Sequence, residues 1–187
     1  MKDADTDRKL SGAEKRALLR IALESIEAEL DGKKRPGPAG KGLLDEKRGA
    51  FVSLKKRGRL RGCIGFIEPR KPLARTVEEM AVASAFQDPR FPPLRKDELQ
   101  DLRVEISVLT PLRRVVDADE IEVGVHGLYI RRGGRAGLLL PQVATEWRWD
   151  RDTFLEETCR KAGLAPAAWR DPETEIYLFA ADVFAEE

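Results

Sequence analysis

The sequence predicts an α+β fold, with one or more largely antiparallel sheets flanked by helices. Two segments have the pattern of β-hairpins: 51–66, which turns at Arg57-Gly58, and 128–140, which turns at Gly133-Gly134. Helical segments interrupt these hairpins without the regular strand–helix alternation that a parallel sheet requires. The 187 residues are enough for one substantial core, or for two small subdomains that share one.

The first half is expected to hold a helix, a hairpin and a second helix. Ser11 and Glu14 form an S-x-x-E capping box, and apolar residues then recur at helical spacing, so a helix should start at Ser11. The segment "DGKKRPGPAGKG" ends that helix. Strands are expected at 51–56 and 60–66. A second helix should follow Pro72, because proline suits the first helical turn.

The second half is expected to alternate strands with short helices. The prolines of "DPRFPPL" end the second helix, and a helical turn is expected at 95–99. "LRVEISVLTP" alternates strictly and is the clearest strand. The segment that begins "DEIEV" is predicted as a short strand before the second hairpin, and "LPQVATEW" as a short helix. Asp152 and Gly163 should bound a further helix. "EIYLFAADVFAE" is expected to close the chain as a strand.

Composition indicates a globular protein of the cytoplasm. Residues 1–10 are expected to form a disordered tail, and 11–187 a single domain. Hydrophobic residues make up 42% of the chain and charged residues 36%, and no apolar run approaches the roughly 20 residues of a membrane span. The start of the chain lacks the apolar core of a secretion signal. Two cysteines cannot form a disulfide framework.

Charge is distributed unevenly although the net charge is +1. The segment 31–75 has 14 Lys/Arg against 4 Asp/Glu, whereas 150–187 has 4 against 10. The basic segment could attract phosphate, nucleotide or nucleic acid. It could equally be a solvated basic face that is balanced by an acidic one, because few aromatic residues are interleaved with the charges.

The stretch "RGRLRGCIGFIEP" places Cys63 in the second strand of the first hairpin. Strand alternation puts Arg61, Cys63 and Gly65 on one face and Gly62 on the other. Glycines inside a strand often mark a close approach by a ligand or another backbone, so they could leave room near the thiol. Arg61 could then hold an anionic group. The alternative is that Cys63 is a small buried residue.

Candidate proton-transfer groups are few. His126 is the only histidine, and it could act as a base or ligand if the two hairpins converge. Glu105 lies mid-strand, where it could be a general base or pair with Arg61. Cys159 fits a helix core, and the chain has no C-x-x-C or H-x-x-x-H spacing, so no metal site is predicted. No phosphate-loop, dinucleotide-binding or hydrolase motif occurs, and no cofactor is predicted.

Asp88 and Arg90 flank a proline in "FQDPRFPPL". The turn could simply terminate a helix, with the Asp88 carboxylate bound to local amides. Alternatively, Asp88 could hold Arg90 toward an anion.

Several of these segments together resemble the AMMECR-type domain family, over nearly the whole chain. The matching segments are "LRGCIGF", "ASAFQDPRFPPL", "VEISVLTP", "EVGVHGLYI" and "LLPQVATEWRWD". The resemblance implies two subdomains with a cleft, and Memo-like or radical-SAM proteins as partners, but no particular activity. Carried over by position, its suspected functional patch comprises Arg61, Gly62, Cys63, Gly65, Asp88, Arg90, Phe91, His126 and Gly127. Phe66 and the Trp147-Arg148-Trp149 run depart from the usual pattern.

Three functional hypotheses follow. The first is a protein that binds a ligand or partner at a patch around Arg61 and Cys63. The second is a cysteine-dependent enzyme for an anionic or protein-borne substrate in a redox or modification pathway, with Cys63 as nucleophile or redox centre and His126 or Glu105 handling protons. The third is a regulatory module associated with nucleic acid. Whether the chain is an enzyme is left open by the sequence.

Overall fold

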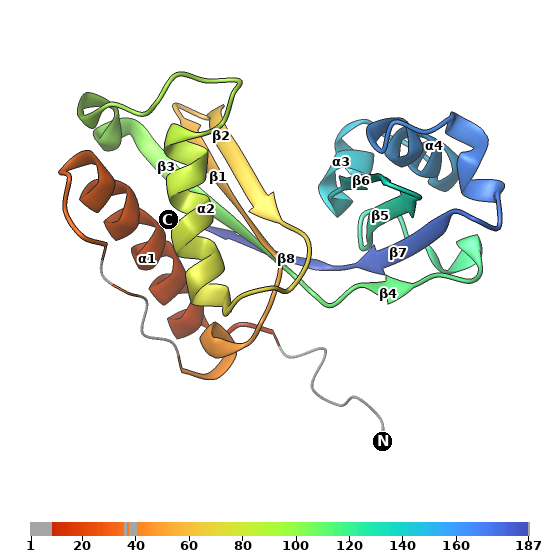
Figure 1. The fold of residues 1–187 in the computed structure, drawn as a ribbon, viewed down its shortest axis with the longest axis horizontal. Helices are drawn as coiled ribbons and strands as arrows, with labels where there is room; N and C mark the ends of the chain where they lie inside the picture. The colour runs from red at the N-terminus through yellow and green to blue at the C-terminus, as the bar shows by residue number, and fades with distance from the viewer. Residues whose placement is uncertain (1–8, 36, 38–40, 187) are drawn as a thin grey trace. The chain divides into compact units, whose positions relative to one another are not determined.

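Two antiparallel sheets, each with its own helices and its own core, make up the fold in the computed structural model (Figure 1). The structure describes residues 9–35, 37 and 41–186. Contacts divide the chain into one unit of Met1–Leu109 with Asp182–Glu187, and a second unit of Thr110–Ala181. The predicted α+β class is therefore confirmed. The single domain and its cleft stay predictions. Most of the expected tail, residues 1–10, lies outside the described residues. Leu10, which was assigned to that tail, belongs to the core of the first unit.

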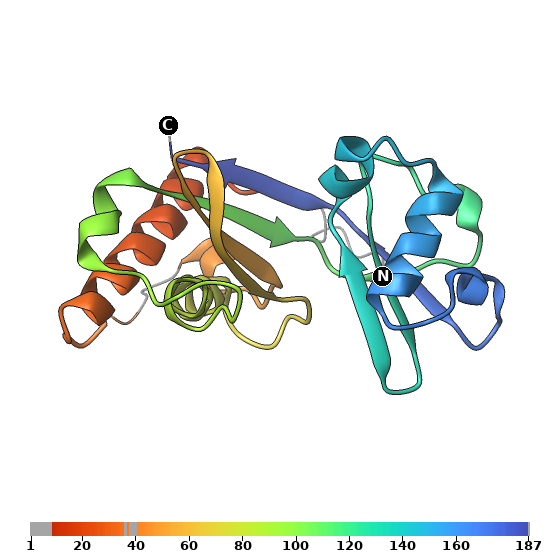
Figure 2. The same ribbon diagram turned by 90° about the horizontal axis from the view of Figure 1, so that it is seen from above.

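The first unit packs two helices on one face of a four-stranded sheet (Figures 1 and 2). The strands have the order β2-β1-β3-β8, so β2 and β8 are the edges. The helices are α1 (Gly12–Leu30) and α2 (Leu73–Phe86), with short 3₁₀ helices η1 (Gly42–Asp45) and η2 (Lys96–Asp101). The strands are β1 (Ala50–Lys56), β2 (Arg59–Phe66), β3 (Leu102–Leu109) and β8 (Ala181–Ala185). Alternate residues of β1 and β3 are buried against the helices, as the strand pattern predicts.

Local signals define the start of this unit as expected. The Ser11 hydroxyl accepts a hydrogen bond from the Glu14 amide, and the Glu14 carboxylate accepts one from the Ser11 amide at 2.9 Å, which completes the capping box. The turn between β1 and β2 has positive φ at both Arg57 (51°) and Gly58 (75°). Two left-handed residues give the backbone twist of a tight hairpin, so the predicted hairpin is confirmed.

The second unit places its helices against a sheet of order β4-β7-β5-β6. Its core includes Ile130, Phe154, Leu155 and Cys159. The strands are β4 (Arg113–Arg114), β5 (Gly127–Arg132), β6 (Arg135–Leu139) and β7 (Glu175–Phe179). The helices are α3 (Pro141–Glu146) and α4 (Arg151–Lys161), with 3₁₀ helices η3 (Ala118–Glu120) and η4 (Pro166–Arg170). The second predicted hairpin is β5–β6.

Three expectations for the second half are wrong. The segment after Asp117 begins with η3 rather than a strand, because the Asp117 side chain and amide bond locally to Asp119 and Glu120. Asp150, not Asp152, caps α4 and accepts the Thr153 amide at 2.8 Å. The final strand is two strands, β7 and β8, which belong to different sheets.

None of the helices in the described part of the chain has the length and apolar character needed to cross a membrane.

Candidate functional site

Strand β2 carries the "LRGCIG" motif along an edge of the first sheet, and its register is irregular. Leu54 of β1 pairs with Gly62, but Lys55 pairs with Leu60, so Arg61 is an extra residue without a partner on β1. Such a β-bulge shifts the alternation of side chains by one residue. Leu60 therefore shares a face with Cys63, whereas the regular alternation expected from the sequence put Arg61 on that face.

The bulge directs Arg61 toward η2. Its Nε and Nη2 donate to the two carboxylate oxygens of Glu98 at 3.1 and 2.9 Å, and Lys56 Nζ donates to the same carboxylate at 2.9 Å. The Arg61 hydrogen bonds are the main reason that the pKa of Glu98 falls to about 2. The sequence had suggested that Arg61 could pair with Glu105. It does not, because Lys55 Nζ donates to the Glu105 carboxylate at 2.7 Å.

The glycines of the motif make room for protein. A Cβ on Gly62 would overlap the backbone carbonyl of Ser84 in α2, and one on Gly65 would overlap the Phe51 ring. The Ser84 hydroxyl also inserts between the two strands, where it donates to the Val52 carbonyl at 2.7 Å and accepts from the Ile64 amide at 2.9 Å. Helix α2 is thus held against β2 at closer range than a side chain at position 62 would allow.

Cys63 meets Asp88 and Arg90 at the outer edge of β2. The Asp88 carboxylate accepts the Cys63 amide at 2.9 Å, and Arg90 Nη2 donates to the Cys63 carbonyl at 3.2 Å. The two side chains satisfy the edge groups that a further strand would bind. Arg90 also donates to Asp88 from its Nε at 2.9 Å and its Nη2 at 2.6 Å. These bonds hold the pKa of Asp88 well below its ordinary value.

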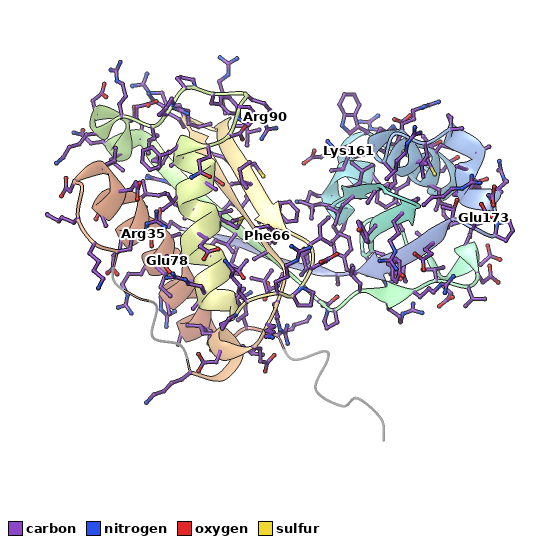
Figure 3. The ribbon with its side chains drawn as sticks, viewed as in Figure 1. Arg35, Phe66, Glu78, Arg90, Lys161 and Glu173 are labelled. Atoms are coloured by element: carbon purple, nitrogen blue, oxygen red, sulfur yellow. The ribbon has the colours of Figure 1, made fainter. Side chains whose placement is uncertain are left out.

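Arg90 is fixed although its side chain is 54% exposed, whereas that of Asp88 is 1% exposed. It projects from the loop that follows α2 (Figure 3). Its guanidinium carbon lies 5.5 Å from the centroid of the Phe91 ring, and that of Arg61 lies 6.0 Å from the same centroid. Among the described residues, no acceptor binds Arg90 Nη1 or the buried Arg61 Nη1. We call Cys63, Asp88, Arg90 and Phe91 the Cys63 edge.

A row of polar side chains crosses the sheet from Cys63, on the face opposite the helices. Ser53 of β1 pairs with Cys63 of β2 and with Glu105 of β3. Neighbouring strands are about 5 Å apart, so Ser53 separates the other two side chains. The Ser53 hydroxyl donates to Cys63 Sγ at 3.2 Å. Of the three residues named as catalytic candidates, Cys63 and Glu105 lie on the same face of this sheet but two strands apart.

His126 and Gly127 belong to the second unit. The His126 Nδ1 accepts the Glu122 amide at 3.0 Å, so the ring closes a local turn. A Cβ on Gly127 would overlap the Phe179 ring, which accounts for that glycine by packing. Cys159 is fully buried in α4, and burial raises the pKa of its thiol. Across the described residues, no three His, Cys, Asp or Glu side chains gather as a metal site would require.

Most of the basic segment 31–75 is neutralised inside the first unit. Ten of its 14 Lys/Arg have a carboxylate within 4.0 Å: Lys33, Arg35, Arg48, Lys55, Lys56, Arg57, Arg61, Arg70, Lys71 and Arg75. Several of the acids, such as Glu98 and Glu105, come from outside the segment. The local excess of charge along the sequence is therefore not an excess of free positive charge, and the nucleic-acid hypothesis gains no support from it.

Sequence reasoning missed Ser53, Ser84 and Glu98. Ser53 and Ser84 carry no motif, and only the pairing of β1 with β2 and the packing of α2 show their contacts. Glu98 does carry a signal, because an acid three residues into a short helix often bonds the residue that precedes it. Its carboxylate accepts the Arg95 amide at 3.1 Å in this way.

Known proteins resemble this chain over nearly its whole length. A family model described as AMMECR1 matches residues 19–184. A protein of Methanothermobacter thermautotrophicus is 50% identical over 186 residues, which cover 95% of this chain and 97% of that protein. A protein of Methanopyrus kandleri is 48% identical, with 96% and 91% covered. The crystal structure of an uncharacterized protein from Pyrococcus horikoshii has a TM-score of 0.84 at 43% identity, with 91% of this chain and 90% of that chain covered. The chain belongs to the AMMECR1 family.

Proposed function

We propose that the chain is a binding protein, and that its Cys63 edge recognises an anionic group on a ligand or on a partner protein. The observation that carries this proposal is the state of Arg90. Its guanidinium is half-exposed, yet a buried carboxylate and a backbone carbonyl already fix its orientation. A cation that is held in place loses little conformational freedom when it binds, so more of the interaction energy remains for affinity.

The surroundings of Arg90 suit an oxyanion such as a carboxylate or phosphate. Phe91 supplies an apolar face beside the guanidinium, and Arg90 Nη1 is left to donate. Guanidinium groups match such anions better than ammonium groups, because their N–H donors lie in one plane. Memo-like and radical-SAM proteins, which the family resemblance suggests, are the first partners to try. A cytoplasmic location is part of the same proposal.

Titration of the ¹⁵N-labelled chain with inorganic phosphate tests this proposal. We expect saturable amide shifts at Cys63, Arg90 and Phe91, which Arg90→Ala abolishes and Arg90→Lys weakens. Arg70→Ala is a matched control, because Arg70 also pairs with an acid two residues before it, Glu68, but at an exposed site. Shifts that spread over many basic residues and survive Arg90→Ala would show that the Cys63 edge is not a binding site.

A second candidate function, chemistry at Cys63, is favoured by the Ser53 hydrogen bond. A hydroxyl that donates to the sulfur can stabilise negative charge on it. The proposal is weaker because Glu105, the nearby candidate base, is already bound to Lys55.

Alkylation with iodoacetamide tests the access that this chemistry needs. We expect the half-buried Cys63 to react in the native chain and the fully buried Cys159 to react only after unfolding. Mass spectrometry should then find one modified thiol in the native chain and both in denaturant, with Cys63→Ser as the control for the site. If Cys63 reacts only in denaturant, a substrate has no access to the thiol and the second candidate fails.

A further inference from the structure

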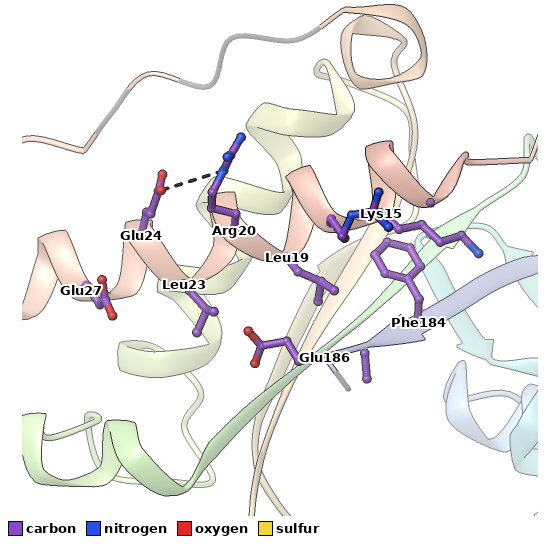
Figure 4. A pocket seen from close by; sticks show the side chains of 11 residues that line it. Lys15, Leu19, Arg20, Leu23, Glu24, Glu27, Phe184 and Glu186 are labelled. Atoms are coloured by element: carbon purple, nitrogen blue, oxygen red, sulfur yellow. Dashed lines mark ion pairs between the residues drawn. The ribbon is translucent and has the colours of Figure 1, made fainter.

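A groove of about 700 Å³ lies within the first unit, between α1 and the edge strand β8 (Figure 4). Leu19 and Leu23 point into it from α1, and Phe184 faces them from β8. Charged residues of α1 line the same groove, and Lys15 at one end is bound to Asp182 at 2.6 Å. The groove therefore has an apolar floor and a charged rim, the composition of a site for another chain.

The charges along the rim are ordered. Arg16 and Arg20 occupy the first half of α1, and Glu24 and Glu27 the second half. Spacings of four, four and three residues keep all four side chains on one side of a helix. All four are exposed. This face of α1 is thus basic toward its start and acidic toward its end.

Interactions within the helix do not account for this order. The helix dipole favours acids near the start of a helix and bases near its end. Helix α1 has no base in its last turn, where Glu27 lies. Arg20 and Glu24 approach only to 3.9 Å, with the base first, which is the weaker arrangement of a helical ion pair. Among the described residues, neither Arg16 nor Glu27 has an ion-pair partner.

We propose that this groove is a homodimer interface, in which α1 of a second copy lies antiparallel to α1 of the first. A twofold axis near Ala22 places Arg16 of one copy opposite Glu27 of the other, and Arg20 opposite Glu24. Each of these pairs then occurs twice. The same arrangement brings Leu19 and Leu23 of both copies together over the apolar floor.

The charge pattern selects a second copy over an unrelated partner. A face that carries both signs in reversed order is complementary to itself only when the two helices run antiparallel. Parallel helices would set bases against bases and acids against acids, which is unfavourable. The groove and the helix also fit each other reciprocally, because each α1 is at once a wall of its own groove and the occupant of the other.

Two charge-reversal variants test the proposal with the full chain. Arg16→Glu with Arg20→Glu makes the whole face acidic, and Glu24→Arg with Glu27→Arg makes it basic. Sedimentation equilibrium should find the wild type dimeric, and each variant alone should dimerise about tenfold more weakly or worse. Mixed in equal amounts, the two variants should form a heterodimer about as stable as the wild-type dimer, because every facing pair is again opposite in sign.

The controls distinguish loss of the dimer interface from loss of the folded structure. Each variant introduces its new charges at the end of α1 where the helix dipole favours them, so circular dichroism and thermal unfolding should still show a folded chain. Reversal of Arg70 and Arg95, which are exposed and do not line the groove, should leave the dimer unchanged. A wild type that is monomeric up to about 1 mM, variants that dimerise like the wild type, or a mixture that forms no heterodimer would each overturn the proposal.

Discussion

Alanine at position 62 is expected to lower the free energy of unfolding by about 3 kcal/mol or more. The added methyl group would overlap the Ser84 carbonyl oxygen and lie 3.0 Å from its carbon, both of which are helix backbone. A backbone atom cannot rotate away as the end of a side chain can, so α2 would have to move from β2. That movement would also disturb the Ser84 hydroxyl between the two strands.

Denaturant unfolding of Gly62→Ala beside Gly134→Ala measures this effect. Gly134 has no atom within 4 Å of the added position and no left-handed backbone, so its variant should stay within about 0.5 kcal/mol of the wild type. Each variant should be followed with a spectroscopic probe in its own unit, the first unit for position 62 and the second unit for position 134, because the two units have separate cores. If the two variants were equally stable, the close approach of α2 would not be the reason for glycine at position 62.

Asparagine at position 88 is expected to cost about 2–3 kcal/mol of stability at neutral pH. The Asp88 carboxylate accepts the Cys63 amide with one oxygen, and Arg90 donates to both oxygens. An amide side chain would turn its NH₂ group toward one of these donors, in a position where the side chain is 1% exposed. A donor would then face a donor without water to separate them.

The pH dependence of the Asp88→Asn effect follows from the lowered pKa of Asp88. The folded pKa is below the unfolded value of about 4, so the carboxylate stabilises the fold fully above that value. Its contribution is lost as the pH falls through the folded pKa. The difference in unfolding free energy between wild type and variant should therefore narrow as the pH is lowered below about 4.

Asp97→Asn provides the matched control for Asp88→Asn. Asp97 also pairs with an arginine two residues away, Arg95, at 2.6 Å, but its side chain is 63% exposed. Exposed ion pairs contribute little to stability, so this variant should lose less than about 1 kcal/mol. Equal losses at positions 88 and 97 would mean that the contact with the edge of β2 is not what makes Asp88 important.

Elements with strong local signals were predictable from the sequence. The Ser11–Glu14 capping box and the Arg57-Gly58 turn act between residues close in the chain, and both are formed as expected. Strand β3 was equally clear, because its apolar and polar residues alternate over most of its length, although Ser107 and Leu109 are buried as well. Errors arose where two local signals competed, as with Asp150 and Asp152 before α4, since either acid can cap a helix.

The contacts of the candidate site depend on residues far apart in the chain. The sequence singled out Arg61, Cys63, Asp88 and Arg90, but the bulge that turns Arg61 to Glu98 exists only once β2 pairs with β1. The Ser53 hydrogen bond to Cys63 likewise needs that pairing. Bulges carry no fixed residue signature, so a regular alternation was the natural expectation and led to the wrong partner for Arg61.

By itself, the sequence determined the α+β class and most helices and strands, because capping, turn formation and alternation act over a few residues. The family followed from the resemblance of its motifs. It also identified the segment around Cys63. Only the tertiary structure decided that the glycines of that segment accommodate α2 and Phe51, and that Asp88 and Arg90 bind the edge of β2. Only the folded chain places β7 and β8 in different sheets and brings most of the basic residues of segment 31–75 next to acids. The physical reason is the separation of these residues along the sequence, because their groups come within hydrogen-bond distance only when the chain folds.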